Sequence, residues 1–211
     1  MKQVLAVIQF RVRGDMRYLS HAETMRMFQR ACVRAGIKAA YSQGFNPHLR
    51  MSPVLPRSVG VESDDEILCL WLEEGDENIN VEHLKDEMPE GIEIGSVEIS
   101  GEKRVPEPSR ARYVIKVKGV DEGIRERIAG LLAGERIVVE RRIGEGGETK
   151  PVNVRPFLES VDIQGEEIIV DCRISTAGTI RVDEILDLLG LEVEDLAEPV
   201  LRKNVQWGHN L

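Results

Sequence analysis

The chain has 211 residues, 42% of them hydrophobic, so it can bury the core of one large domain or of two domains of about 100 residues each. No apolar run approaches the roughly 18 residues of a membrane span, and the opening residues have neither the length nor the cleavage site of a signal peptide, so we expect a cytoplasmic protein without membrane contact. The net charge of −9 argues against indiscriminate binding of nucleic acids.

The first half of the chain predicts the element order β-α-β-β-α-β. In "VLAVIQFRVR" apolar and polar side chains alternate, which predicts a half-buried strand with Gln9, Arg11 and Arg13 on its polar face. An S-x-x-E capping box that begins at Ser20 starts a helix, and the helix ends at Gly36. The segments that follow are predicted as strands at 37–42, 66–74 and 92–100 and as a short helix at 80–88. This order is that of the ferredoxin-like, split βαβ arrangement.

The second half repeats this order without repeating the sequence. Residues 103–111 contain two prolines and no periodicity, which predicts a linker. After it, strands are predicted at 112–118, 136–142, 166–175 and 200–207, and helices at 121–134 and 181–190. We therefore predict an α+β fold of two tandem ferredoxin-like domains, an N-terminal domain over residues 1–102 and a C-terminal domain over residues 112–211.

The cysteines and histidines do not predict a metal site. Cys32, Cys69 and Cys172 are odd in number and far apart, so they indicate neither a disulfide framework nor a zinc or iron–sulfur site. We expect them to be small buried apolar residues. The four histidines show no ligand spacing either, so no metal and no cofactor is predicted.

The charges are distributed unevenly along the chain. Residues 11–57 contain nine Lys or Arg and two acidic residues, whereas residues 58–109 contain three Lys or Arg and sixteen acidic residues. A local basic field on an acidic chain predicts an anion site. On the predicted sheets, Arg11 and Arg13 lie on an open face, as do basic residues from 112 to 118, where guanidinium groups suit phosphate or carboxylate. Alternatively, these arginines pair with the acidic 58–109 segment.

The loop "YSQGFNPHLRMSP", residues 41–53, is richer in hydrogen-bonding side chains than a connection requires. We expect it to lie near the start of the first helix, close to Tyr18 and His21. The predicted anion- or RNA-binding residues are Arg11, Arg13, Arg17, Gln43, Asn46, His48 and Arg50, with the four arginines in a single basic cluster. Alternatively, Gln43 and Asn46 only fix their own loop, and His21 is a core residue on the apolar stripe of the helix.

Residues 10–63 carry a resemblance to a known family, most distinctly in "RGDMRYLSH" and "YSQGFNPHLRMS". Two later segments, "KPVNVRPFLESVDI" and "TAGTIRVDEILDLLG", are also similar to it. The family is that of radical-SAM-linked proteins, a bacterial domain of unknown function. Its members are typically encoded beside, or fused to, a radical-SAM protein, so the resemblance implies a radical-SAM partner. The chain itself lacks the C-x-x-x-C-x-x-C spacing of a radical-SAM cluster, so it is not predicted to be the radical enzyme.

Three functions are compatible with the sequence. The first is a non-catalytic accessory protein that binds RNA, or an RNA-like anionic substrate, and works with the radical-SAM partner. The second is a metal-independent endoribonuclease resembling the CRISPR repeat-processing RAMP proteins, with His21, Tyr18 or His48 as acid and base. The third is a protein-interaction scaffold without nucleic acid. The acidity of the chain favours the third over the second.

Overall fold

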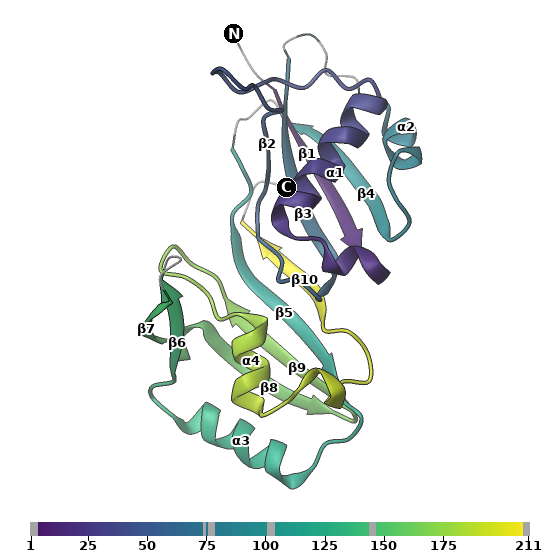
Figure 1. Ribbon diagram of the computed structural model, residues 1–211. Helices are drawn as coiled ribbons and strands as arrows, with labels where there is room; N and C mark the ends of the chain where they lie inside the picture. Colours follow the sequence, from purple (N-terminus) through teal and green to yellow (C-terminus); the bar gives the residue numbers. More distant parts are fainter. Residues whose placement is uncertain (1–3, 74, 76–78, 101–103, 144–146, 209–211) are drawn as a thin grey trace. The chain divides into compact units, whose positions relative to one another are not determined.

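The computed structural model describes residues 4–208 apart from 74, 76–78, 101–103 and 144–146 (Figure 1). The chain divides into two compact units. The N-terminal unit is Met1–Pro108 together with Trp207–Leu211, and the C-terminal unit is Ser109–Gln206. Each unit combines a mostly antiparallel sheet with a few helices, so the α+β class is confirmed. The first strand of the C-terminal unit begins at Pro108, within the 103–111 segment for which we predicted a linker.

The described residues of the N-terminal unit form four strands and two α-helices. In chain order its elements are β1 (Val4–Val12), the 3₁₀ helix η1 (Gly14–Tyr18), α1 (His21–Arg34), β2 (Met51–Pro53), β3 (Glu62–Leu72), α2 (Val81–Asp86) and β4 (Ile92–Ser100). The strands lie in the order β4-β1-β3-β2, and each strand is antiparallel to its neighbours.

The alternation of β1 places its two faces in different environments. The even-numbered residues from Val4 to Val12 are buried against Phe28 of α1 and Leu84 of α2, as predicted. On the other face, Leu5 and Val7 are also buried, packed with partly buried side chains that include Val105 and Trp207. We expected this face to be open. Only its second half is exposed, because the segments around 105 and 207 cover the first half.

Helix α1 begins as the sequence predicts. The backbone N–H of Glu23 donates to Ser20 Oγ (3.3 Å), and the backbone N–H of Ser20 donates to Glu23 Oε2 (2.9 Å). Gly36, with φ of 69°, follows the end of the helix. The expectation that His21 could be a core residue is wrong: it is exposed, because it occupies the first helical position, before the part of α1 that packs on the sheet.

The second strand does not lie where we predicted it. Residues 37–42 form only isolated bridges, and the strand that pairs with β3 is Met51–Pro53. The chain leaves the sheet after Ala40 and returns at Arg50, whose N–H donates to the Ala40 carbonyl (2.7 Å). The segment between these residues is a closed loop, and such a closure is a non-local event that hydrophobic periodicity does not encode.

The C-terminal unit contains a main sheet and a separate two-stranded sheet. Its elements are β5 (Pro108–Lys116), α3 (Glu122–Ala133), β6 (Val138–Ile143), β7 (Glu148–Asn153), the 3₁₀ helix η2 (Arg155–Phe157), β8 (Leu158–Gln164), β9 (Glu167–Arg173), α4 (Val182–Leu189), the 3₁₀ helix η3 (Val193–Asp195) and β10 (Leu201–Trp207). The main sheet has the order β10-β5-β9-β8, whereas β6 and β7 pair with each other in a two-stranded sheet.

One strand of the C-terminal unit was assigned wrongly. The predicted strand 136–142 is β6 of the separate hairpin, and its expected place in the main sheet is taken by β8, which we did not predict. The reason is burial: Leu158 and Val161 of β8 are buried, whereas Val138 of β6 is 46% exposed. The hairpin is attached through Arg141, which donates twice to Glu184 at the start of α4 (2.7 and 2.8 Å).

The three cysteines are free and buried, as predicted. Burial raises the pKa of the Cys32 and Cys172 thiols to about 12 and that of Cys69 to about 11. Among the described residues, no three His, Cys, Asp or Glu side chains are grouped so that they could hold a metal ion. The described helices are all too short or too polar to cross a membrane.

Candidate functional site

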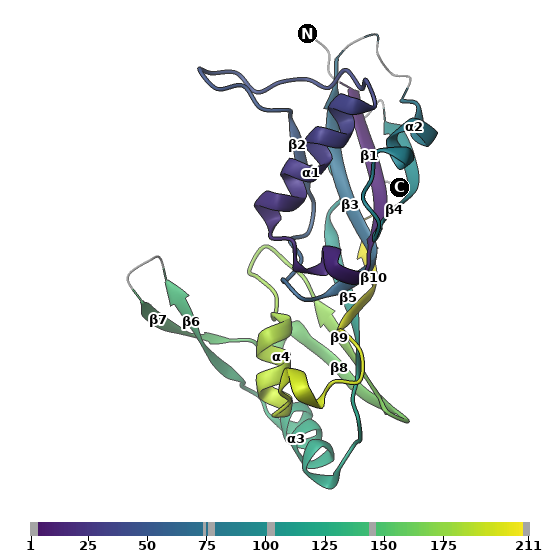
Figure 2. The same ribbon diagram turned by 45° about the vertical axis from the view of Figure 1, so that its right-hand side comes forward.

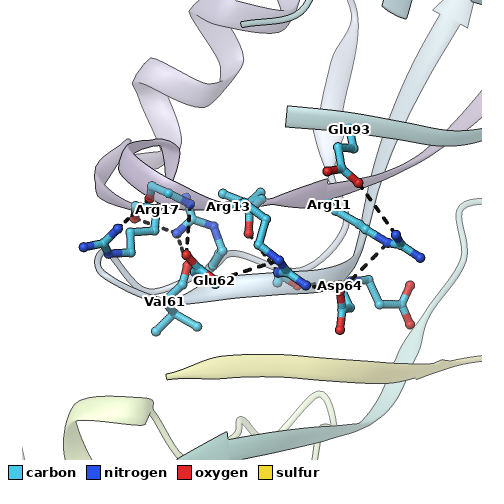
Figure 3. A network of polar contacts seen from close by, with 12 residues as sticks. Arg11, Arg13, Arg17, Val61, Glu62, Asp64 and Glu93 are labelled. Carbon is cyan, nitrogen blue, oxygen red and sulfur yellow. Dashed lines mark hydrogen bonds and ion pairs between the residues drawn. The ribbon is translucent and has the colours of Figure 1, made fainter. Parts of the chain in front are cut away.

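The end of β1 carries two arginines that are paired with carboxylates (Figure 3). Arg11 lies 3.9 Å from Asp64 and 3.6 Å from Glu93, measured between guanidinium nitrogen and carboxylate oxygen. Arg13 contacts Asp64 and lies 3.8 Å from Glu62. The alternative in which these arginines pair with the acidic 58–109 segment is therefore the arrangement found. Two cations face three carboxylates, so the group has no excess positive charge with which to attract an anion.

The turn after β1 uses Arg17 locally. Its Nη1 donates to the Gly14 carbonyl (2.8 Å), and its Nη2 donates to the hydroxyl of Tyr18 (2.7 Å). The guanidinium carbon also lies 4.2 Å from the centroid of the Tyr18 ring. Together these contacts fix the side chains of Arg17 and Tyr18 against each other on the η1 turn.

Arg57, which the sequence analysis missed, connects the η1 turn to the segment before β3. We call this region, residues 14–21 and 57–61, the corner. Its Nη1 donates to the carbonyls of Arg17 (2.7 Å) and Val61 (2.5 Å), and its Nη2 donates to those of Met16 and Leu19 (3.3 Å each). One side chain thereby bonds three carbonyls of "RGDMRYLSH". The acceptors are backbone groups, so no pattern of residue types could have identified this role.

A small hollow lies beside the start of α1. It is lined by His21, Thr24, Arg57 and the buried Glu66, among others, and its volume is about 20 Å³. That is room for about one water molecule. The corner is therefore built as a packed scaffold, and its geometry does not provide a substrate pocket.

The 41–53 loop lies at the other end of the sheet (Figures 1 and 2). The guanidinium of Arg50 lies 5.2 Å from the centroid of Trp71, which pairs with Leu5 at the beginning of β1. Val12, at the end of β1, pairs with Ser63. At about 3.3 Å per residue, Leu5 and Val12 are about 23 Å apart along the strand. The predicted single cluster of Arg11, Arg13, Arg17 and Arg50 is therefore not formed.

The same separation applies to the three candidate acid–base residues. His48 belongs to the loop, whereas Tyr18 and His21 belong to the corner at the opposite end of the sheet (Figure 2). They cannot act together on a single bond in this fold. We had expected the loop to approach the start of α1, but the residues that do so are Pro53, at the end of β2, and residues 55–57, which follow it.

The loop has a stem closed by backbone contacts. Tyr41 and Leu49 form a bridge, and the Ser42 N–H donates to the His48 carbonyl (2.7 Å). The His48 N–H donates to Ser42 Oγ (3.0 Å). At the tip, Gly44 has φ of 134°, a conformation that other residues rarely adopt, and the neighbouring Phe45 has a relative exposure of 111%.

The polar side chains of the loop are exposed as well. Gln43, Asn46 and the His48 ring make no hydrogen bond to any described residue, so the alternative in which the two amides fix their own loop is wrong. The loop presents an aromatic ring and three hydrogen-bonding side chains to the solvent on a stem held by main-chain bonds. The sequence signal available for Phe45 was an aromatic residue directly after a glycine and two positions before a proline.

Basic side chains on the open face of the C-terminal sheet are also paired. Arg112 donates twice to Asp171 (2.7 and 2.8 Å), which raises the pKa of Arg112 and lowers that of Asp171. Lys116 lies 2.5 Å from Glu198. Lys118 donates to a main-chain carbonyl, that of Glu194 (2.5 Å).

Comparison with known proteins assigns a family. The model of the family described as "Uncharacterized protein conserved in bacteria (DUF2344)" matches residues 6–183, and the chain belongs to this family. No curated protein matches it. Among solved structures, a chain in "Crystal Structure of a Cbf5-Nop10-Gar1 Complex" is similar, with a TM-score of 0.45 and 11% identity. The match covers 95% of this chain and 48% of that one, so this chain spans about half its length; a likeness this distant carries no argument.

Proposed function

We propose that the chain is a non-catalytic accessory protein that binds a partner protein through the loop of residues 41–49. The observation that carries the proposal is the complete exposure of Phe45 at the loop tip. Burying a phenylalanine side chain contributes about 1.5–3 kcal/mol, which Phe45 does not gain within its own chain. Aromatic residues are enriched at the centres of protein interfaces, and binding residues commonly lie on loops that a rigid scaffold positions.

The partner we propose is a radical-SAM protein. The support is the resemblance of "YSQGFNPHLRMS" and "RGDMRYLSH" to the radical-SAM-linked proteins, whose members are typically encoded beside or fused to such an enzyme. The two motifs differ in their surroundings. The second forms the packed corner bonded by Arg57, whereas the first forms the exposed loop, so the first is the motif available to a partner.

The test is binding of the chain to the radical-SAM protein encoded beside it, measured by calorimetry with the purified proteins. Phe45→Ser should weaken the complex by about 1.5–3 kcal/mol, or roughly 10- to 150-fold, and leave the thermal unfolding temperature unchanged. The matched control is Val59→Ser, which alters an apolar side chain that is 59% exposed but outside the loop. The proposal would be contradicted if neither the wild type nor Phe45→Ser bound the radical-SAM protein, or if the two bound it with equal affinity.

RNA is the second candidate ligand, and one observation favours it. Tyr41 and Phe45 are exposed on the loop, and Arg26 and Arg30 are exposed on α1. Figures 1 and 2 both place the loop at the end of that helix. A surface that carries both aromatic rings and basic side chains is typical of proteins that bind single-stranded nucleic acids. This arrangement replaces the arginine cluster that the sequence suggested.

The RNA candidate predicts a dependence on salt. If Arg26 and Arg30 both contact phosphates of a single strand, changing both to Gln should flatten the slope of log affinity against log salt by about 1.4. The measurement is fluorescence anisotropy of a labelled single-stranded RNA at several salt concentrations. Arg125→Gln with Arg136→Gln, two exposed positions of the C-terminal unit, is the control. An unchanged slope in the Arg26/Arg30 variant would remove RNA as a ligand of this surface.

We also propose that both units are ferredoxin-like domains in tandem. Numbering the four main-sheet strands of each unit in chain order gives the order 4-1-3-2 twice, as β4-β1-β3-β2 and as β10-β5-β9-β8. Two helices connect the strands in each unit, at the places where the βαββαβ pattern requires them. An experimentally determined structure with another strand order in either unit would contradict this proposal.

A further inference from the structure

The open face of the C-terminal sheet contains a polar hollow of about 210 Å³. It lies across β8, β9, β5 and β10, which are adjacent strands of the sheet (Figure 1). Its polar lining residues are Arg110, Arg112, Glu159, Asp171, Asn204 and Gln206. This hollow is about ten times larger than the one beside His21, so it has room for a small ligand group rather than for a single water molecule.

A β-bulge brings one carboxylate to this face. The register between β8 and β9 shifts between Leu158 and Ser160, so Glu159 is an extra residue in the strand. Leu158 is buried on the helix side, whereas Glu159 reaches the open face, where it accepts hydrogen bonds from Arg110 (3.1 Å) and Arg173 (3.2 Å). The bulge therefore places a single carboxylate between two guanidinium groups.

The hollow is lined by two arginines and two carboxylates, and further charged residues lie at its edge. Arg110 and Arg173 are directly opposite each other in the β5–β9 ladder, an arrangement that is unfavourable for like charges, and they share Glu159. Arg112 and Asp171 neutralise each other as a bidentate pair. These five residues carry three positive and two negative charges, and the carboxylate of Asp162, which acts on Arg112, brings the total to zero. The arginines at the end of β1 differ, because there the carboxylates outnumber the cations.

Hydrogen-bond donors at the hollow are also available. Arg110 donates to Glu159 through Nε, and no described contact uses its two terminal amino groups. The side-chain amides of Asn204 and Gln206 likewise make no hydrogen bond among the described residues. A guanidinium group with free terminal amino groups is suited to planar or tetrahedral oxyanions, and carboxamide groups can complete the coordination of such a group.

We propose that this hollow binds a singly charged oxyanion, a carboxylate or a phosphodiester, through Arg110, Asn204 and Gln206. The free donors of these three residues line the space that the oxyanion would fill. Glu159 sets the affinity, because its charge partly cancels that of Arg110. The proposal is independent of the 41–49 loop and of the partner that the loop binds.

The test is a titration of the ¹⁵N-labelled full chain with dimethyl phosphate and, separately, with acetate at constant ionic strength, followed by the backbone amide signals of β5 and β10. We expect saturable shifts with at least one of the two anions, and the tighter one identifies the ligand class. Arg110→Gln should raise the Kd at least tenfold. Glu159→Gln should lower the Kd several-fold, because it removes the negative charge beside Arg110.

Arg110→Gln should raise the Kd and Glu159→Gln should lower it, and these opposite changes distinguish a binding site from a structural network. In a structural network both substitutions would only disturb the sheet. Arg125→Gln, on the exposed side of α3, is the matched control and should leave the Kd unchanged. If Arg110→Gln fails to fold, Gln206→Leu takes its place and should weaken binding several-fold. The proposal is overturned by the absence of saturable shifts with both anions. An unchanged Kd in Arg110→Gln or Gln206→Leu, or a raised Kd in Glu159→Gln, would overturn it equally.

Discussion

Replacing Arg57 with Met should destabilise the N-terminal unit by about 3 kcal/mol. The side chain donates two short hydrogen bonds, of 2.7 Å to the Arg17 carbonyl and 2.5 Å to the Val61 carbonyl, and two of 3.3 Å to neighbouring carbonyls. Hydrogen bonds from charged groups contribute about 1.5–3 kcal/mol each. Two short bonds at the lower end of that range give about 3 kcal/mol, and the longer bonds add little.

Urea unfolding followed by tryptophan fluorescence measures this effect in the appropriate unit, because Trp71 and Trp207, the two tryptophans of the chain, both belong to the N-terminal unit. Arg57→Lys keeps the charge but loses the fork, so it should recover only part of the stability. Arg30→Met, at an exposed position of α1, should change the unfolding free energy by less than about 0.5 kcal/mol. A loss below about 1 kcal/mol in Arg57→Met would refute the view that this side chain holds the corner.

Two further predictions concern the backbone and the pH dependence. Gly91→Ala should lower the free energy of unfolding by about 2 kcal/mol or more, measured by the same tryptophan signal, because φ is 91° and the new Cβ would lie 2.5 Å from the Arg13 carbonyl oxygen. The control is Gly75→Ala, where φ is 90° but no atom lies close to the new Cβ, and it should lower the free energy of unfolding clearly less. An equal loss in the two variants would contradict the clash at Gly91. Burial acts to raise the pKa of Glu184, but the hydrogen bonds from Arg141 and from the Arg181 backbone lower it below its ordinary value. The stabilisation from Glu184 is therefore present above the unfolded-state pKa of about 4.3 and is lost as the pH falls through the lower folded pKa. Glu184→Gln should remove this part of the acid sensitivity in urea unfolding followed by circular dichroism, and an unchanged slope between about pH 5 and pH 3 would contradict the ion pair.

Local patterns predicted the elements that depend on local chemistry. The alternation of β1, the capping box of α1 and the residue range of β4 follow from neighbours in the sequence, and the structure has them where we expected them. β2 and β8 were missed for a different reason. β2 has only three residues, and β8 contains a bulge, so neither shows a clean period of two.

The candidate site was predictable in its residues but not in its arrangement. The excess of basic residues in positions 11–57 is evident from the sequence, but the carboxylates that pair with them lie on strands far along the chain. Asp64 lies on β3 and Glu93 on β4. Which carboxylate meets which arginine depends on strand register, which the sequence does not reveal. The exposure of Phe45 was hidden for a similar reason, because it depends on how far the loop extends from the core.

The central claim is that the 41–49 loop contacts a partner protein, and site-specific photo-cross-linking tests it most directly. The photoreactive analogue benzoylphenylalanine is placed at position 45 in cells that make both proteins, and position 59, where Val59 is 59% exposed, is the control outside the loop. We predict that position 45 forms a cross-link to the radical-SAM protein, identified by mass spectrometry, and that position 59 does not. Failure of position 45 to cross-link to any protein, or equal cross-linking from both positions, would contradict the account.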